Sequence, residues 1–265
     1  MSKVISKDGT MIAYDKKGTG PAVILVDGAF GYRGLGFGNQ LANLLAQHFS
    51  VYTYDRRGRG ESTNSKHFAI EREVEDIKAL IDAAGGSAYV YGISSGACLA
   101  LEAAIRLGEK ITKLALYEPP YNSDPSSVQE WKDYRTTLSE LVDANRRGEA
   151  VELFMHFVRT PADMIDGMRK APVWQMLEAV APTLVYDAAE MGEDRLVPVE
   201  RAAAIKSKTL VMDGGANLQY MPFMHATARA LAEAIPNSEH RTLDGQTHDV
   251  KAEVLAPLLI EFFGF

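Results

Sequence analysis

The sequence predicts an α/β protein with a mostly parallel sheet and helices on both faces. Short runs rich in β-formers alternate with helical patterns along most of the 265 residues. The run PAVILVDG (21–28) is continuously apolar, which is typical of a strand buried on both faces. The stretch 69–86 has amphipathic helical spacing and closes with Gly85 and Gly86.

The expected elements follow this alternation from end to end. A hairpin through Asp8 and Gly9 joins the first two strands. The expected strands lie at 3–6, 10–18, 21–28, 50–55, 88–94, 111–118, 208–214 and 238–244. The expected helices lie at 39–47, 69–86, 96–108, 224–235 and 252–263.

The alternation stops between residues 119 and 200. This stretch shows helical segments, seven prolines and many Met, Trp and Tyr residues, but no convincing strand. We therefore expect a helical cap at 119–200, inserted between a first core part (1–118) and a second core part (201–265).

Composition limits the classes of function. A formal charge of −7 argues against a nucleic-acid or anionic-membrane partner, so we expect a small-molecule substrate. The single cysteine, Cys98, allows no disulfide within the chain and no Cys-based metal site, and we expect it in the core. Neither a signal peptide nor a membrane-spanning run is evident, which favours a cytoplasmic protein. The oligomeric state is not predicted.

The stretch YVYGISSGACLA (89–100) carries the strongest chemical signal. An apolar run and an Ala/Leu-rich run leave almost no room for a loop, so the chain must turn sharply at Ser94. Gly92 and Gly96 fit the G-x-S-x-G pattern, in which small residues relieve crowding around a nucleophilic serine. The N-terminus of the following helix favours negative charge on a substrate oxygen.

These residues resemble the α/β-hydrolase fold family. The resemblance rests on GISSG, VDGAFG, YDRRGRGEST and GQTHD, and it covers nearly the whole chain outside 119–200. It implies a Ser–acid–His triad in that chain order and an oxyanion hole built from two backbone N–H groups. By this resemblance Ser95 and Ala29, or its neighbour Phe30, supply those N–H groups.

Six histidines are candidates for the base that a serine nucleophile needs. His248 is favoured because it lies in a loop after the last strand, at the edge of the sheet where the sharp turn at Ser94 lies. We call this turn, residues 92–96, the elbow. We expect surface or packing roles for the others, with His156 a second-choice substrate contact. The remaining histidines are His48, His67, His225 and His240.

The acid of the triad has more than one candidate in the sequence. The family's commonest acid position falls near Asn217, whose amide carries no charge. The family's alternative position is the end of the strand before the cap, where Glu118 is held by two prolines, and we favour Glu118. Asp213 remains an alternative, and Asp249 a weak one.

Two further stretches near the expected site are informative. The family usually has His-Gly where this chain has Asp27-Gly28, so Asp27 is either a turn residue or a charge that tunes the oxyanion hole. The arginines of YDRRGRGEST are expected in a solvated turn. The glycine-rich stretch 28–38 lacks the spacing of a dinucleotide site, and no metal spacing is evident, so we expect no cofactor and no metal.

The expected activity is that of a serine hydrolase of the carboxylesterase type. Its substrate is a small or medium hydrophobic ester or a lactone, in a pocket formed by Phe30, Trp131, Trp174 and Tyr220. A cofactor-free perhydrolase and a weakly active small-molecule receptor are the alternatives. A dehalogenase or an epoxide hydrolase needs an aspartate at the elbow, so Ser94 argues against both.

Overall fold

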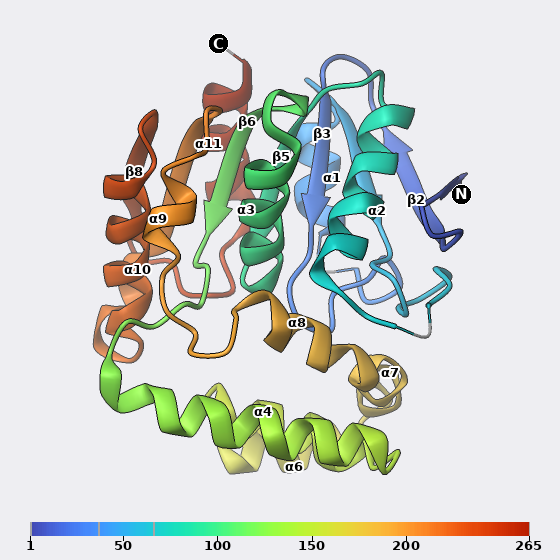
Figure 1. Cartoon of the computed structure of the whole chain (residues 1–265), viewed down its shortest axis with the longest axis vertical. Coiled ribbons are helices and arrows are strands. Elements are labelled where there is room, and N and C mark those ends of the chain that lie inside the picture. The colour runs from blue at the N-terminus through green and yellow to red at the C-terminus, as the bar shows by residue number, and fades with distance from the viewer. Residues whose placement is uncertain (1, 37, 66, 265) are drawn as a thin grey trace.

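The computed structural model describes residues 2–36, 38–65 and 67–264, and its centre is a sheet of eight strands flanked by helices (Figure 1). The strand order is β1-β2-β4-β3-β5-β6-β7-β8. The strands are β1 (Ser2–Ile5), β2 (Met11–Lys17), β3 (Ala22–Val26), β4 (Ser50–Tyr54), β5 (Ala88–Ile93), β6 (Ile111–Tyr117), β7 (Lys208–Gly214) and β8 (Ser238–Leu243). The mostly parallel α/β sheet expected from the sequence is confirmed.

The first two strands form the expected hairpin at one edge of the sheet. β1 pairs antiparallel with β2, and β2 pairs antiparallel with β4. Every other pairing, from β4 through β3 to β8, is parallel. The carboxyl ends of the parallel strands therefore meet at one edge, where ligands bind in open α/β sheets.

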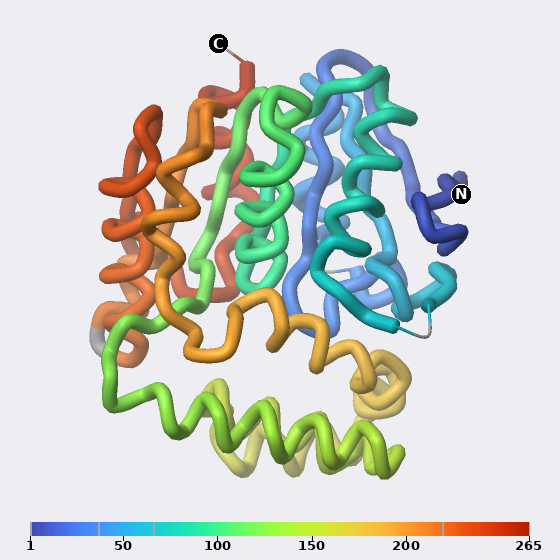
Figure 2. Tube along the Cα trace, viewed as in Figure 1, coloured from blue at the N-terminus to red at the C-terminus, as the bar shows by residue number. Residues whose placement is uncertain are grey.

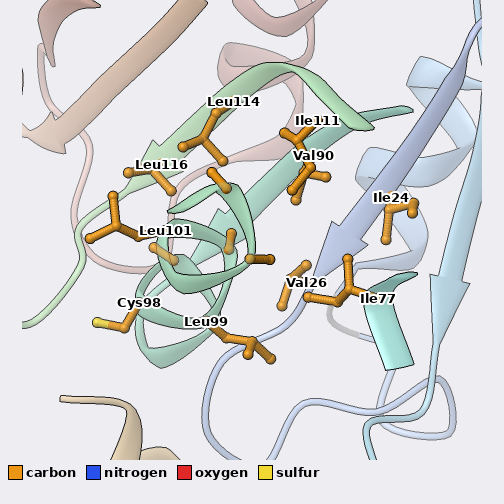
Figure 3. Packing of buried hydrophobic residues seen from close by; sticks show 14 of the residues in the cluster. Ile24, Val26, Ile77, Val90, Cys98, Leu99, Leu101, Ile111, Leu114 and Leu116 are labelled. Carbon is orange, nitrogen blue, oxygen red and sulfur yellow. The ribbon is translucent and has the colours of Figure 1, made fainter. Parts of the chain in front are cut away.

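Helices cover both faces of the sheet. One face packs against α2 (Ile70–Ala83), α3 (Ser95–Leu107) and α10 (Pro222–Ala234), and the other packs against α1 (Asn39–Leu45) and α11 (Ala252–Gly264). Figure 3 shows Cys98, Leu99 and Leu101 of α3 packed among Val26, Val90 and Leu116 of the central strands. Cys98 is fully buried, as expected.

The segment between β6 and β7 is helical throughout its regular structure. It contains α4 (Val128–Asp143), α5 (Arg147–Phe157), α6 (Ala162–Arg169), α7 (Val173–Val180), α8 (Leu184–Glu190) and α9 (Val199–Ala202). Figure 1 shows α4, α6, α7 and α8 lying across the carboxyl ends of the strands. We call α4 to α8 the cap.

The cap has a hydrophobic core of its own and two connections to the sheet. Figure 2 shows the chain leaving β6, crossing the lower edge of the molecule through the cap, and returning upward before β7. Aromatic rings stack at its centre, with the ring of Tyr134 5.5 Å from that of Trp131 and 4.2 Å from that of Phe157. The same cluster includes Phe30 from the loop after β3, so the cap packs directly on the sheet's carboxyl edge.

Candidate active site

Ser94 lies at the corner between β5 and α3. Its backbone has φ 56° and ψ −133°, a conformation that residues with a side chain rarely adopt. A Cβ atom on Gly92 would lie 2.4 Å from the carbonyl oxygen of Gly96, and one on Gly96 would lie 2.3 Å from that of Val26. The sharp turn therefore depends on both glycines, and it presents Ser94 at the N-terminus of α3.

Glu118 lies one residue beyond β6 and is fully buried, with φ 45°. Its Oε2 atom is 2.6 Å from Nδ1 of His248, and its Oε1 atom accepts the N–H of Gly214 at 2.8 Å. A carboxylate only accepts hydrogen bonds, so the proton of the neutral imidazole is assigned to Nδ1. This leaves Nε2 of His248 as the atom that can take a proton.

Asn217 supports the same carboxylate. Its Nδ2 atom lies 2.9 Å from Oε1 and 2.9 Å from Oε2 of Glu118, and the residue is 5% exposed. The amide thus occupies the sequence position where the family's commonest acid falls, but here it donates to an acid that comes from the end of β6. Burial of Glu118 is compensated by donors on both oxygens.

Tyr117, which was not among the expected site residues, joins the elbow to the histidine loop. Its carbonyl oxygen accepts the N–H of Ser94 at 3.0 Å, and its hydroxyl donates to the carbonyl of Thr247 at 2.6 Å. Thr247 directly precedes His248, so one fully buried side chain fixes the loop that carries the histidine. An apolar-looking strand residue gives no sequence signal for this contact.

The loop after β3 passes directly over Ser94. A Cβ atom on Gly28 would lie 2.8 Å from Cβ of Ser94, so only glycine allows this approach. Among the described residues, the N–H groups of Ala29 and Phe30 have no acceptor. Ser95 opens α3, so its N–H has no partner within the helix. In the part of the chain that the structure describes, the N–H groups of Ala29, Phe30 and Ser95 are thus available to a substrate oxygen.

The expectation of a solvated turn at the arginines was wrong. Arg56, Arg57 and Arg59 are each at most 1% exposed. Arg59 donates through Nη1 to the carbonyl oxygens of Gly28 at 2.6 Å and Gly31 at 3.2 Å, and so holds the loop over Ser94. The local pattern of glycines and charges cannot show this, because the acids that pair with the arginines lie far away in the chain.

Asp187 of α8 is the acid that links the cap to the site. Its carboxylate accepts Nη1 of Arg56 at 2.8 Å and Nη2 of Arg59 at 2.8 and 2.9 Å. The hydroxyl of Ser95 also donates to it at 2.8 Å. One buried carboxylate therefore connects the cap, the loop over Ser94 and the first residue of α3.

Two further buried acids complete this network. Glu73 accepts Nε and Nη2 of Arg56 at 2.8 and 2.7 Å, and Glu190 also contacts Nη2. Burial, opposed by the charge of Arg56, raises the pKa of Glu190 well above its usual range. Glu73, Asp187 and Glu190 thus surround Arg56, and Asp187 is shared with Arg59.

Asp27 packs within the glycine-rich loop. A Cβ atom on Gly31 would lie 2.5 Å from Cβ of Asp27, and one on Gly38 would lie 3.3 Å from its Oδ1. Burial raises the pKa of Asp27 to about 6, although the charges of Arg59 and Arg56 oppose the shift. The carboxyl therefore titrates near neutral pH, one residue before the glycine that touches Ser94.

The alternative acid and two other histidines lie together elsewhere. Asp213 is 1% exposed and contacts His225 Nδ1 at 3.0 Å and His240 Nε2 at 2.5 Å. His48 and His67 are exposed, and His156 lies in α5, where its side chain is 54% exposed. Among the described residues, His248 is thus the histidine that Glu118 contacts.

The residues expected to line the pocket lie in different surroundings. Phe30 packs edge-on against Phe154 of the cap, with ring centres 5.0 Å apart. Trp131 is fully buried, so no surface of its ring is free to contact a substrate in this conformation. Trp174 lines a hollow on the cap beside Arg146 and Glu178, and Tyr220 is 81% exposed.

The sequence matches a protein-family model over most of its length. The model described as "Alpha/beta hydrolase family" matches residues 23–252. The chain belongs to the α/β hydrolase family. The matched range contains the elbow, Glu118, the whole cap and His248, in agreement with the strand order and the buried elbow described above.

A solved structure of high similarity supports the same assignment. An α/β hydrolase from Sphaerobacter thermophilus DSM 20745 is 48% identical over 99% of this chain and 100% of that chain, with a TM-score of 0.88. The enol-lactonase from Burkholderia xenovorans LB400 is 22% identical, with a TM-score of 0.71 over the full length of both chains. The second likeness concerns the fold alone.

Curated relatives match a shorter part of the chain. "Uncharacterized hydrolase YraK" of Bacillus subtilis is 34% identical over 115 residues, which are 42% of this chain and 42% of that protein. "Putative non-heme bromoperoxidase BpoC" of Mycobacterium tuberculosis is 32% identical over 106 residues, 40% of each protein. The matches thus span about two fifths of these relatives' length.

The helices of the described residues give no sign of a bilayer-crossing segment. None of them combines the length and the apolar character that such a helix needs.

Proposed function

We propose that this α/β hydrolase is a serine hydrolase that cleaves small or medium hydrophobic carboxylic esters or lactones through an acyl-enzyme on Ser94. The observation that carries the proposal is the corner conformation of Ser94 together with the approach of Gly28. Such a turn positions a hydroxyl for attack, and backbone donors lie on either side of it.

The reaction begins with attack of the Ser94 hydroxyl on the substrate carbonyl. Nε2 of His248 takes the hydroxyl proton, and Glu118 stabilises the imidazolium through Nδ1. The N–H of Ser95 and that of Ala29 or Phe30 bind the negative oxygen of the tetrahedral intermediate. His248 then returns the proton to the leaving alcohol, and the same groups activate water to release the acid.

The substrate class rests on the surroundings of the loop over Ser94. Phe30 and the cap's aromatic cluster make the neighbourhood apolar. Related structures described as an esterase from Thermogutta terrifontis and as the Burkholderia enol-lactonase share the fold at 22% identity. An acyclic carboxylic ester and a lactone present the same reactive carbonyl group, so one triad can cleave both.

A panel of p-nitrophenyl esters and γ-lactones of increasing chain length tests this function. We expect saturable hydrolysis by the wild type and loss of about 10³-fold or more in kcat for Ser94→Ala. Ser95→Ala is the matched control, because it keeps the backbone N–H and should retain most activity. Wild-type-like hydrolysis by Ser94→Ala would refute the elbow as the reactive site.

A perhydrolase is the second candidate, and the partial likeness to the bromoperoxidase-named relative favours it. In this reaction hydrogen peroxide replaces water and attacks the acyl-enzyme, so that a peracid leaves in place of the acid. Peracid formation from acetate and peroxide, compared with ester hydrolysis at equal enzyme, separates the two activities. Tight ligand binding with very slow turnover in both assays would instead indicate a receptor.

A further inference from the structure

A cluster of three side chains on the α10 face of the sheet lies outside the machinery described above. We propose that Asp213, His225 and His240 bind a divalent transition-metal ion, with Zn²⁺ as its natural occupant. Within the described residues, this is the one group of three or more His, Cys, Asp or Glu side chains with converging ligand atoms. The inference goes beyond the proposed function, which uses none of these three residues.

Sheet register brings two of the ligands together. β7 and β8 pair in parallel, with Val211 opposite His240 and Asp213 opposite Thr242. Val211 packs in the cluster on the α3 and α10 side, whereas Met212 packs on the α11 side. Since alternate strand residues share a face, Asp213 and His240 both face α10.

The helix supplies the third ligand. His225 lies in the first turn of α10, which covers this face of β7 and β8. Its Nδ1 atom is 3.0 Å from Oδ2 of Asp213, while Nε2 of His240 is 2.5 Å from Oδ1. The two rings thus approach opposite oxygens of one buried carboxylate, with their centres 5.3 Å apart.

These distances suit a small tetrahedral ion after modest side-chain rotation. All three ligand atoms lie within 4.8 Å of one another. Ligand atoms around Zn²⁺ are separated by about 3.3 Å, given Zn–N and Zn–O bonds of about 2.0–2.2 Å. Imidazole and carboxylate ligands suit Zn²⁺ better than Mg²⁺ or Ca²⁺, which prefer oxygen ligands alone.

The site is anchored on one side and open on the other. Asp213 is buried, and Thr242 donates to its Oδ1 at 3.1 Å. Such a hydrogen bond holds a metal-binding carboxylate in a fixed orientation. The side chains of His225 and His240 are 31% and 21% exposed. Solvent therefore has access to a fourth coordination position, and both rings have room to turn.

Metal binding would join α10 to β7 and β8 at three points. Both rings now contact Asp213 directly, and the metal would replace these contacts. Bound Zn²⁺ should therefore stabilise the folded chain. Stability and stoichiometry report on this site without reference to hydrolysis.

Equilibrium dialysis of untagged, EDTA-treated protein against Zn²⁺ at pH 7.5, with metal counted by mass spectrometry, tests the proposal. We expect one equivalent of Zn²⁺ and a higher melting temperature with the metal. Co²⁺ should give visible d–d absorption. His225→Gln and His240→Gln should each weaken binding roughly tenfold or more, because each removes one of three ligands.

Matched variants separate this site from other histidines. His48→Gln removes an exposed histidine, and His248→Gln removes the triad base; both should keep one equivalent of Zn²⁺ at wild-type affinity. The proposal is overturned if the wild type binds no Zn²⁺, in which case the cluster is a hydrogen-bonded group only. It is also overturned if His248→Gln abolishes binding, or if both ligand variants fold and bind as the wild type does.

Discussion

Nδ1 of His248 lies 2.6 Å from Oε2 of Glu118, and the amide of Asn217 lies 2.9 Å from both oxygens of the same carboxylate. The acid and the amide come from the ends of neighbouring strands, β6 and β7. Glu118 is fully buried, so its charge depends on these donors. This arrangement gives His248 a fixed tautomer and assigns a supporting role to Asn217.

Glu118→Gln tests this division of roles. The glutamine amide carries no charge and can donate toward Nδ1, which favours the wrong tautomer of His248. We expect kcat for an ester to fall by about 10²–10⁴-fold while KM changes little. Asn217→Ala keeps the carboxylate and should cost only about tenfold. Steady-state kinetics of both folded variants measures the two losses in kcat. A larger loss for Asn217→Ala than for Glu118→Gln would show that Glu118 is not the acid of the triad.

Replacing a glycine of the elbow should destabilise the fold. Gly96→Ala places a Cβ 2.3 Å from the carbonyl oxygen of Val26, so strand and helix must separate. We expect a loss of several kcal/mol in the free energy of unfolding, or no folded protein. Gly167→Ala in α6 is the control, because its Cβ meets nothing within 4 Å. It should be neutral or stabilise by up to about 1 kcal/mol in urea titrations.

The raised pKa of Asp27 should make the free energy of unfolding depend on pH. Its pKa is about 6 in the folded chain against 3.8 ordinarily, so the folded state binds this proton more tightly. Protonation therefore favours folding below pH 3.8, and that contribution is lost as the pH rises to about 6. At 1.36 kcal/mol per unit the full effect is on the order of 3 kcal/mol.

Asp27→Asn cannot ionise and should avoid this loss. Its advantage over the wild type in the free energy of unfolding should grow between pH 4 and 6 and stay constant above pH 6.5. Urea titrations at several pH values measure the difference, with Asp166→Asn, an exposed position of α6, as the control. A difference that is the same at every pH would contradict the raised pKa.

The link between cap and elbow depends on the charge of Asp187. Asp187→Asn keeps the shape of the side chain but removes the carboxylate that Arg56 and Arg59 share. We expect a loss of about 3–5 kcal/mol in the free energy of unfolding, because an unpaired buried charge is costly. Ser95→Ala removes only the hydroxyl that donates to Asp187 and should cost about 1 kcal/mol. Equal, small effects of both variants would argue against the network.

Local patterns predict the sheet and the elbow well. Continuous apolar strands such as 22–26, and the glycines around Ser94, impose their structure through neighbours in the chain. The expected helix 69–86 corresponds to α2 at 70–83 and the hairpin through Gly9 forms as expected, with φ 88° at that glycine. The family resemblance also indicated Glu118 and His248, which the structure brings together.

The sequence does not show which side chains that lie far apart in the chain contact each other in the fold. Arg56 is buried because Glu73 and Asp187 lie against it, and these acids are 17 and 131 residues away. The contact from Tyr117 to Thr247 spans 130 residues. Asp213, His225 and His240 have no metal-ligand spacing in the chain, and only the strand register and the position of α10 bring them together.

Covalent labelling with a fluorophosphonate probe shows whether Ser94 is an activated nucleophile. Intact-protein and peptide mass spectrometry of the wild type and of Ser94→Ala and Ser95→Ala should be compared. We expect one adduct per chain, on Ser94, in the wild type and in Ser95→Ala, and none in Ser94→Ala. A folded wild-type protein with no adduct, or with an adduct on another residue, would contradict this expectation.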